Sequence, residues 1–276
     1  MSVIAQAGAK GRQLHKFGGS SLADAKCYLR VAGIMKEYSQ AGDMMVVSAA
    51  GSTTNQLISW LKLSQSDRLA AHQVQQSLRR YHTELIGGLL EPAAADTLIA
   101  AFIHDLERLA GLLDGGVSEA VYAEVVGHGE VWSARLMAAV LNQLGMEAAW
   151  LDARAFLRAE RAAQPQVDEG LSYPLLQQLM AQHPNKRLVV TGFISRNQAG
   201  ETVLLGRNGS DYSATQIGAL AGASRVTIWS DVAGVYSADP RKVKDACLLP
   251  LLRLDEASEL ARLAAPVLHA RTLQPV

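Results

Sequence analysis

The chemistry of this chain starts from a lysine that stands directly before a glycine-rich turn. Lys16 is followed by Phe17-Gly18-Gly19-Ser20-Ser21. Residues 12–15 predict a first strand, and apolar residues recur at helical spacing from Leu22 to Ala41. Such a turn leaves free backbone N–H groups at the start of the helix, where the helix dipole also favours an anion. Because Lys16 adds a positive charge, the sequence predicts a phosphate site here.

A plain strand–turn–helix is the alternative, with Ser21 as the helix cap and Asp24 completing a capping box. No Lys-Ser or Lys-Thr pair follows the glycines, which excludes a Walker A loop. The His-Arg-Asp and Asp-Phe-Gly signatures of protein kinases do not occur in the sequence either. If the turn binds phosphate, it does so as a site of another kind.

Two further stretches could carry polar chemistry in the first half of the chain. Met44 to Ser48 predicts a buried strand that ends in the small, hydroxyl-rich residues 49–55, before a helix from Gln56. Gly127-His128-Gly129-Glu130 interrupts a helical pattern that runs from Val117 to Leu144. Each glycine weakens a helix by about 1 kcal/mol, so we expect a helix end or a close ligand there. Glu130 could instead only complement the helix dipole, and His128 reads as a structural histidine.

The elements that must position these residues alternate along the chain. Strands are expected at Glu147–Leu151, Arg187–Ile194 and Arg225–Trp229, with a hairpin arm at Gly200–Leu204. Helices are expected from Ser66 to Leu113 with a break at Gly87-Gly88, at Tyr173–Gln182, from the polar loop Gly206–Ala214 to Gly222, and from Asp255. This alternation predicts an α/β/α sandwich with a mostly parallel central sheet and a site along the carboxyl edge of its strands.

Composition narrows the class of partner. The 276 residues are 49% apolar and 19% charged, and 26 basic residues balance 26 acidic ones. Nothing in this balance favours nucleic acid or an anionic membrane, so a small molecule is the expected partner. The start of the chain does not look like a signal peptide, and no apolar run approaches ~20 residues. Cys27 and Cys247 are expected to be buried thiols in a reducing compartment, which predicts the cytoplasm.

Five motifs together resemble one family. Lys16 to Ser21, Val47 to Asn55, Gly129-Glu130, Gly206 to Ala214 and Trp229 to Arg241 occur in the order found in aspartokinases. The resemblance covers Leu14 to about Leu273 and implies the amino-acid kinase (carbamate kinase-like) fold. It is closest to the kinase portion of the type II bifunctional aspartokinase–homoserine dehydrogenases.

The resemblance implies ATP-dependent phosphorylation of the L-aspartate side chain to 4-phospho-L-aspartate, the first step toward lysine, threonine and methionine. It implies one catalytic domain at 12–276, with an amino-acid-binding half at about 12–195 and a nucleotide-binding half at about 196–276. The regulatory ACT domains and the NADP-dependent dehydrogenase of the longer relatives would lie outside it. It also implies a homo-oligomer, and Mg²⁺ held mainly through the phosphates rather than by protein ligands.

The resemblance also implies a role for each motif residue. Lys16 would stabilise the transferring phosphoryl group beside Ser48, and Asp211 would orient that lysine. Thr54, Glu130 and Arg207 would hold aspartate. The nucleotide would contact Gly18, Gly19, Ser230, Asp231, Tyr236 and Arg241.

The residue chemistry agrees with these roles. A carboxylate is already a nucleophile at neutral pH, so catalysis reduces to positioning and charge neutralisation. Arg207 can grip a carboxylate in a fork and Glu130 can take an ammonium group, which suits an amino acid. A surface pair between Arg207 and Asp211 is the alternative.

Three positions depart from the family pattern. His128 stands where relatives carry a smaller residue, Asn208 replaces a glycine, and Pro266 replaces a lysine that reaches the nucleotide. Arg241 is the expected source of compensation for Pro266. Another amino-acid kinase, acting on glutamate or acetylglutamate, and a weakly active amino-acid-binding or assembly domain remain alternatives.

Overall fold

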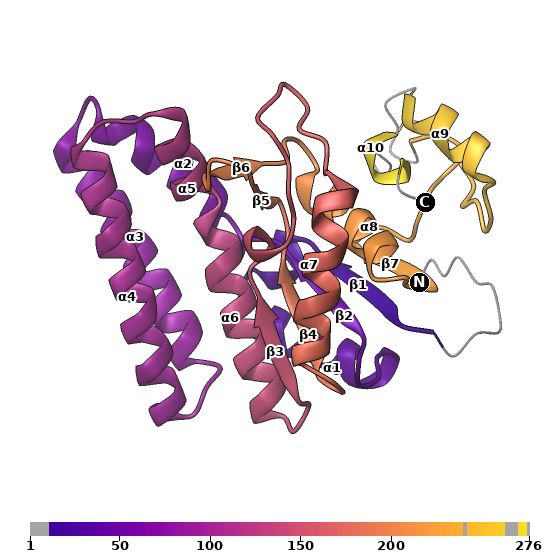
Figure 1. Cartoon of the computed structure of the whole chain (residues 1–276), viewed down its shortest axis with the longest axis horizontal. Helices are drawn as coiled ribbons and strands as arrows, with labels where there is room; N and C mark the ends of the chain where they lie inside the picture. The colour runs from indigo at the N-terminus through magenta and orange to yellow at the C-terminus, as the bar shows by residue number, and fades with distance from the viewer. Residues whose placement is uncertain (1–10, 240–241, 263–269, 275–276) are drawn as a thin grey trace.

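The computed structural model describes residues 11–239, 242–262 and 270–274, and Figure 1 shows their arrangement. The elements in chain order are β1 (Gln13–Phe17), η1 (Gly19–Leu22), α1 (Ala25–Tyr38), β2 (Met44–Val47), α2 (Thr53–Ser64), α3 (Arg68–Gly87), α4 (Pro92–Asp114), α5 (Glu119–Val126), α6 (His128–Gln143), β3 (Ala148–Leu151), η2 (Ala153–Ala155), α7 (Glu169–Gln182), β4 (Arg187–Thr191), β5 (Ile194–Arg196), β6 (Thr202–Leu204), α8 (Gly209–Leu220), β7 (Arg225–Trp229), α9 (Leu254–Arg262) and α10 (Ala270–Leu273). No helix of the described ranges is long and apolar enough to cross a membrane.

The centre of the molecule is a five-stranded sheet in the order β3-β4-β2-β1-β7. Every pairing in it is parallel, with Lys16 opposite Val46 on one side and Ile228 on the other. A separate antiparallel pair joins β5 and β6. The predicted α/β sandwich with a mostly parallel sheet is therefore confirmed, and the polar loops that follow β1, β2 and β7 leave the same edge.

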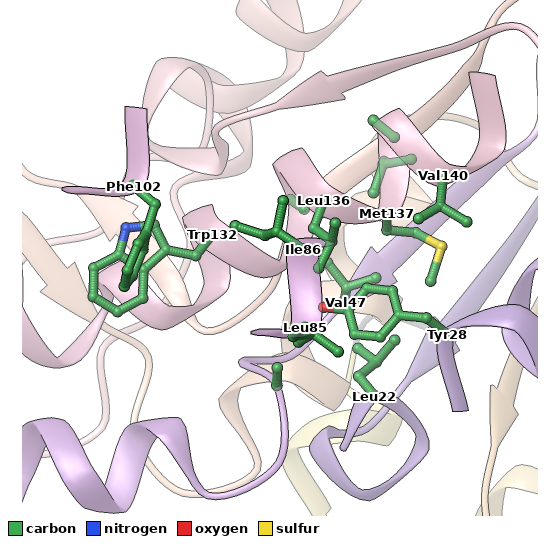
Figure 2. Packing of buried hydrophobic residues seen from close by; sticks show 14 of the residues in the cluster. Leu22, Tyr28, Val47, Leu85, Ile86, Phe102, Trp132, Leu136, Met137 and Val140 are labelled. Carbon is green, nitrogen blue, oxygen red and sulfur yellow. The ribbon is translucent and has the colours of Figure 1, made fainter. Parts of the chain in front are cut away.

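Helices cover both faces of the sheet, as parallel sheets require. Met45 and Val47 of β2 face a core shared with α1 and α6, while Met44 and Val46 face the core beneath α8. Figure 2 shows the first of these cores, where Tyr28 of α1 lies near side chains of α6. The long hairpin of α3 and α4 flanks this side of the sheet (Figure 1). The central strands β2 and β4 thus bury residues on alternate faces, which holds their carboxyl ends in a fixed place.

Helix starts differ from the sequence prediction where short polar residues form the caps. The first helix was expected from Leu22, but a 3₁₀ turn occupies Gly19–Leu22 and α1 begins at Ala25. Asp24 caps α1 by accepting a hydrogen bond from the Cys27 N–H at 2.8 Å, so the alternative with Ser21 as cap is wrong. Similarly, α2 begins at Thr53 rather than Gln56, and α7 begins at Glu169, behind its Asp168 cap, rather than at Tyr173.

The expected strand over Arg187–Ile194 is two strands. β4 ends at Thr191, and Phe193 has a left-handed backbone with φ of 67°. The Phe193 N–H donates to Ser213 Oγ at 2.9 Å, which turns the chain toward α8 and out of the sheet. The expectation of two buried thiols is also wrong, because Cys27 is only half-buried and Cys247 is exposed.

Candidate active site

Lys16 is the second-last residue of β1, and its ammonium group lies against the first turn of α8. Its Nζ lies 2.6 Å from Asp211 Oδ1, and the lysine is 8% exposed. A Cβ on Gly18 would lie 3.4 Å from that Nζ, so the missing side chain leaves room beside the charge. This space next to an ammonium group and a glycine turn fits an anionic oxygen, and so fits the phosphates that the sequence predicts.

The loops that follow β1 and β2 interlock. The Gly51 N–H donates to Gly19 O at 3.0 Å, and the Ser48 N–H donates to Phe17 O at 3.1 Å. A Cβ on Gly19 would lie 2.8 Å from Ala49 O, a contact that cannot be accommodated without moving backbone. Gly19 therefore serves loop packing, and the hydrogen bond to Phe17 O holds the half-buried Ser48 beside β1.

Glu130 stands in the first turn of α6 and is 3% exposed. The start of α6 packs directly on the β2 loop, since a Cβ on Gly129 would lie 2.8 Å from the Ala49 Cβ. Burial raises the pKa of Glu130 to about 8, although hydrogen bonds from its own backbone N–H and that of Ala49 act in the opposite direction. Its Oε2 is buried without a hydrogen-bond partner. A buried acid with an open oxygen is suited to receive a cationic group.

Thr54 lies half-buried in the first turn of α2, behind the same loop. Its neighbour Thr53 is fully buried, donates to Ala50 O at 2.6 Å and lies 3.1 Å from His82 Nε2 through the same hydroxyl. Burial lowers the pKa of His82 to about 3, so this histidine is a neutral structural partner. It fixes Thr53 and leaves the adjacent Thr54 as the threonine available to a ligand.

The loop from Gly206 to Asp211 has a left-handed backbone at two positions. Gly206 has φ of 80° and Asn208 has φ of 54°. Asparagine is one of the few residues other than glycine that adopts this conformation readily, which explains how Asn208 replaces the family's glycine. The turn starts α8 at Gly209, brings Asp211 to Lys16 and leaves Arg207 exposed.

A buried ion cluster braces the start of α6, and the sequence did not predict it. His128 is 2% exposed, with Nε2 3.4 Å from Asp105 Oδ2 and Nδ1 3.6 Å from Glu124 Oε1. Arg135 Nη1 lies 2.5 Å from the same Asp105 oxygen. Arg154 Nη1 lies 2.7 Å from Glu124 Oε2. His128 is therefore a buried contact residue two positions before Glu130, which explains why this chain carries a larger residue there.

The charges of this cluster are held by their neighbours. Burial acts to raise the pKa of Asp105, but the contacts with His128 and Arg135 outweigh it and lower the pKa to about 2. Burial acts in the same way on Glu124, and Arg154, Thr202 and Arg108 lower its pKa to about 2. Both carboxylates are ionised at neutral pH. The signal in the sequence was Asp105 itself, which interrupts the apolar face formed by Phe102, Leu106 and Leu109.

The predicted nucleotide residues lie on a more open side. Ser230 and Asp231 follow β7 and are exposed, and Ser230 Oγ donates to Asp231 Oδ1 at 3.2 Å. Tyr236 is half-buried and forms an isolated antiparallel bridge with Leu248. Trp229 joins this side to β1, because its ring stacks on Phe17 at a centroid distance of 6.0 Å. Arg241 and Pro266 lie outside the described residues, so their roles stay predictions.

The structure brings the predicted residues together to different degrees. Lys16 and Asp211 are in contact, and backbone hydrogen bonds and glycine packing link Gly19, Ser48 and Glu130 to the same pair of loops. Thr54 stands at the start of α2, and Arg207, Ser230 and Tyr236 stand outside the helices and strands. Their ligand contacts stay predictions. Groups of three or more His, Cys, Asp or Glu side chains able to hold a metal ion are not found within the described ranges.

Comparisons with known proteins agree with this geometry. The model of the amino acid kinase family matches residues 11–276. The chain is 87% identical over 276 residues to the bifunctional aspartokinase/homoserine dehydrogenase 2 of Escherichia coli (strain K12), covering 100% of this chain and 34% of that protein. It is 34% identical over 270 residues to the chloroplastic bifunctional aspartokinase/homoserine dehydrogenase 2 of Arabidopsis thaliana, covering 95% of this chain and 30% of the relative.

A solved structure gives the same result. The crystal structure of E. coli aspartokinase III in complex with aspartate and ADP matches with a TM-score of 0.86 and 30% sequence identity, covering 96% of this chain and 59% of that one. The chain spans about a third of the length of the two bifunctional relatives. The resemblance drawn from five short motifs is confirmed, and the chain belongs to the amino acid kinase family.

Proposed function

We propose that this chain is an aspartate kinase domain, which transfers the γ-phosphoryl group of MgATP to the side-chain carboxylate of L-aspartate. One observation carries the substrate assignment. Glu130 is buried in the centre of the site with an oxygen that has no partner, and an amino acid with a free ammonium group supplies the missing cation. The relative solved with aspartate and ADP supports the same pair of ligands.

The proposed reaction needs little acid–base chemistry. An oxygen of the aspartate side chain forms a bond to the γ-phosphorus while the bond from that phosphorus to the bridging oxygen of ADP breaks. The attacking carboxylate is already ionised, so no proton has to be removed. Lys16 would neutralise charge on the transferring group, and Asp211, 2.6 Å away, would hold its ammonium in place. Mg²⁺ would enter with the nucleotide and neutralise phosphate charge.

The two ends of the substrate would be read by different parts of the chain. Glu130 would pair with the ammonium group and Thr54 lies close by on the start of α2, while Arg207 would grip the α-carboxylate in a fork. Ser230, Asp231, Tyr236 and Arg241 would contact the nucleotide together with Gly18 and Gly19. In this proposal residues 12–195 provide most amino-acid contacts and residues 196–276 most nucleotide contacts, with Lys16 and Asp211 joining the two halves.

The rival substrates differ at one end of the molecule. N-acetylglutamate has no ammonium group to satisfy Glu130, whereas glutamate has one and is longer by a methylene. Trapping the acyl phosphate with hydroxylamine, with aspartate, glutamate and N-acetylglutamate compared at equal concentration, tests the proposal. We expect hydroxamate from aspartate well above the other two. Equal or greater product from either rival would overturn the substrate assignment, and no product from any of them would favour the binding or assembly module.

Two broader expectations accompany this function. A cytoplasmic location and a homo-oligomer remain predictions from the residue pattern and the family resemblance. Light scattering of the purified chain over a range of concentrations tests the second of them.

A further inference from the structure

Arg271 of α10 reaches under the loop that carries Arg207 and Asp211. The arginine is 5% exposed, and its Nη1 donates to Leu205 O at 2.6 Å. Its guanidinium carbon lies 4.1 Å from the centroid of the Tyr212 ring. Leu205 is the residue before Gly206 and Tyr212 is the residue after Asp211, so one side chain contacts both ends of the loop.

Hydrogen bonds to the segment 165–167 hold both Arg271 and the Tyr212 ring in place. Its Nη2 donates to the backbone oxygen of Pro165. The Tyr212 hydroxyl donates to Gln166 Oε1 at 3.1 Å and accepts from the Val167 N–H at 3.2 Å, and the tyrosine is 1% exposed. The segment 165–167 thus holds both the arginine and the ring beneath it. The planar Arg271 guanidinium binds two backbone carbonyls and stacks on the Tyr212 ring at the same time, so its position and orientation are both fixed.

The loop between these ends needs external support. Gly206 and Asn208 both adopt left-handed backbone, and such positions persist when surrounding contacts over-determine them. A Cβ on Gly206 would lie 3.6 Å from Arg271 Nη1, so the guanidinium lies directly against the turn. Arg207 is exposed, and its direction therefore depends on the backbone that carries it.

We propose that Arg271 is a positioning residue for this loop, which aims Arg207 at the substrate carboxylate and keeps Asp211 against Lys16. The inference rests on the proposed aspartate kinase function for its kinetic consequence. It couples α10, the last helix that the structure describes, to the substrate end of the site through Arg271.

The test compares Arg271→Ala with a matched arginine elsewhere. Arg158 also binds backbone carbonyls, donating to Arg154 O at 2.8 Å and Ala155 O at 3.1 Å. Among the described residues, none of its hydrogen bonds reaches the 206–211 loop. The first readout is amide hydrogen exchange in the full chain. Gly209, Asp211 and Tyr212 have N–H groups bonded within the loop, to Gly206 O and Asn208 O, and so report its order.

We expect Arg271→Ala to speed exchange at these three amides by about tenfold or more, and Arg158→Ala to leave them unchanged. Unchanged exchange in folded Arg271→Ala would overturn the inference, whatever the enzyme does. If Arg271→Ala does not fold, Arg271→Lys replaces it, because lysine keeps the charge over Tyr212 and loses the fork to the two carbonyls. Faster loop exchange in that variant supports the inference, and wild-type exchange overturns it.

The second readout is steady-state kinetics. Arg271→Ala should raise the KM for aspartate on the order of tenfold, the scale of one charge-assisted contact, with a smaller effect on the KM for MgATP. In the Arg207→Ala variant, adding Arg271→Ala should raise the KM for aspartate little further, because the side chain that Arg271 positions is already absent. If the two substitutions together raise the KM for aspartate by the product of their separate effects, Arg271 does not act through Arg207. If Arg207→Ala alone leaves the KM unchanged, the assignment of Arg207 in the proposed function fails, and exchange at the loop amides still decides the role of Arg271.

Discussion

The candidate site has a buried half and an exposed half, and the two are built differently. Lys16 and Glu130 are 8% and 3% exposed, and they stand where a core strand ends and a core helix begins. Arg207, Ser230 and Asp231 are exposed and stand on loops. The buried half is therefore part of the folded core, whereas the exposed half depends on loop backbone.

This difference predicts different effects of substitutions on stability and on ligand binding in the two halves. A residue of the buried half is already desolvated before any ligand arrives, so its charge affects the free energy of unfolding as well as binding. A residue of the exposed half is hydrated until the ligand arrives, and its loss should change binding with little effect on stability. Substitutions in the two halves can therefore be told apart by measuring activity and melting temperature together.

The largest effect is expected for Lys16→Ala. Removing one preorganised charge at the transferring group typically costs ~10²–10³ in turnover. The variant should keep its aspartate affinity, because Lys16 acts on the phosphoryl group. Turnover is measured by hydroxamate formation, with Lys36→Ala on the exposed face of α1 as the control. Wild-type turnover in Lys16→Ala would remove Lys16 from the reaction.

Glu130→Gln should follow, with aspartate binding weakened by roughly ten- to a hundredfold, the scale of one hydrogen bond to a charged group. The amide matches the carboxyl in size but cannot form the ion pair with an ammonium group. Isothermal titration with aspartate measures this loss. Unaltered affinity would mean that Glu130 only complements the dipole of α6.

The same variant gives a pH test of the buried half. Glu130 has an ordinary pKa of 4.5 in the unfolded chain and about 8 in the folded one, so the folded state binds the extra proton between these values. Its stabilising effect is complete below pH about 4.5 and is lost as the pH rises through about 8. The melting temperature of the empty wild type should therefore fall relative to Glu130→Gln across this window. Parallel melting curves over the window would contradict the burial argument.

Binding of aspartate should also release a proton below pH about 8, if the ammonium group pairs with ionised Glu130. The binding enthalpy should then depend on the ionisation enthalpy of the buffer, and Glu130→Gln should abolish that dependence. Titrations in two buffers of different ionisation enthalpy measure the proton directly. A wild-type binding enthalpy that is independent of the buffer would rule out this linkage.

In the exposed half, Arg207→Ala should raise the KM for aspartate about tenfold without changing the melting temperature. Arg207→Lys should recover only part of the loss, because a lysine cannot form the fork to a carboxylate. Arg80, on the exposed surface of α3, provides the control substitution. A loss of several degrees in melting temperature would place Arg207 with the buried half and weaken the comparison.

The smallest effects are expected on the nucleotide side. Ser230→Ala and Tyr236→Phe each remove one hydroxyl, and one hydrogen bond is worth a change of about two- to tenfold in the KM for MgATP. The KM for aspartate should stay the same in both. A larger change for aspartate than for MgATP would move these residues to the other ligand.

Much of the fold was predictable because local signals and the sheet agree. β7 matches the expected Arg225–Trp229, and β2 lies within Met44–Ser48, since short apolar runs between turn residues have few other solutions. The split between β4 and β5 was missed because Phe193 carries a positive φ that no residue type announces. The site residues were predicted from the order of five motifs. Several of these motifs follow strands, and the carboxyl ends of parallel strands meet at one edge of the sheet.

Side-chain contacts between residues far apart in the chain could not be predicted from the sequence. Arg154 meets Glu124, and Arg271 meets Leu205, through side chains whose meeting depends on the packing of several elements. Only Asp105 gave a sign, as a charge on an apolar helix face, and its partners Arg135 and Trp132 lie on another helix. Periodicity indicates that such a residue is buried, but it does not identify the residue that pairs with it.

The ion cluster beneath α6 also has a consequence for how this chain can change over evolutionary time. Glu124 is half-buried and is contacted by Arg108, Arg154 and Thr202, so losing Arg154, the more buried of its two arginine partners, leaves part of its charge uncompensated. Deleting one member of a buried pair costs about 3–5 kcal/mol, a large share of the ~5–15 kcal/mol that keeps a domain folded. A single substitution at a buried member such as Asp105 is therefore expected to reduce the free energy of unfolding, whereas a coordinated exchange of several members can be neutral. We therefore expect the members of the cluster to change together between relatives, because an exchange of one member alone gives a less stable protein.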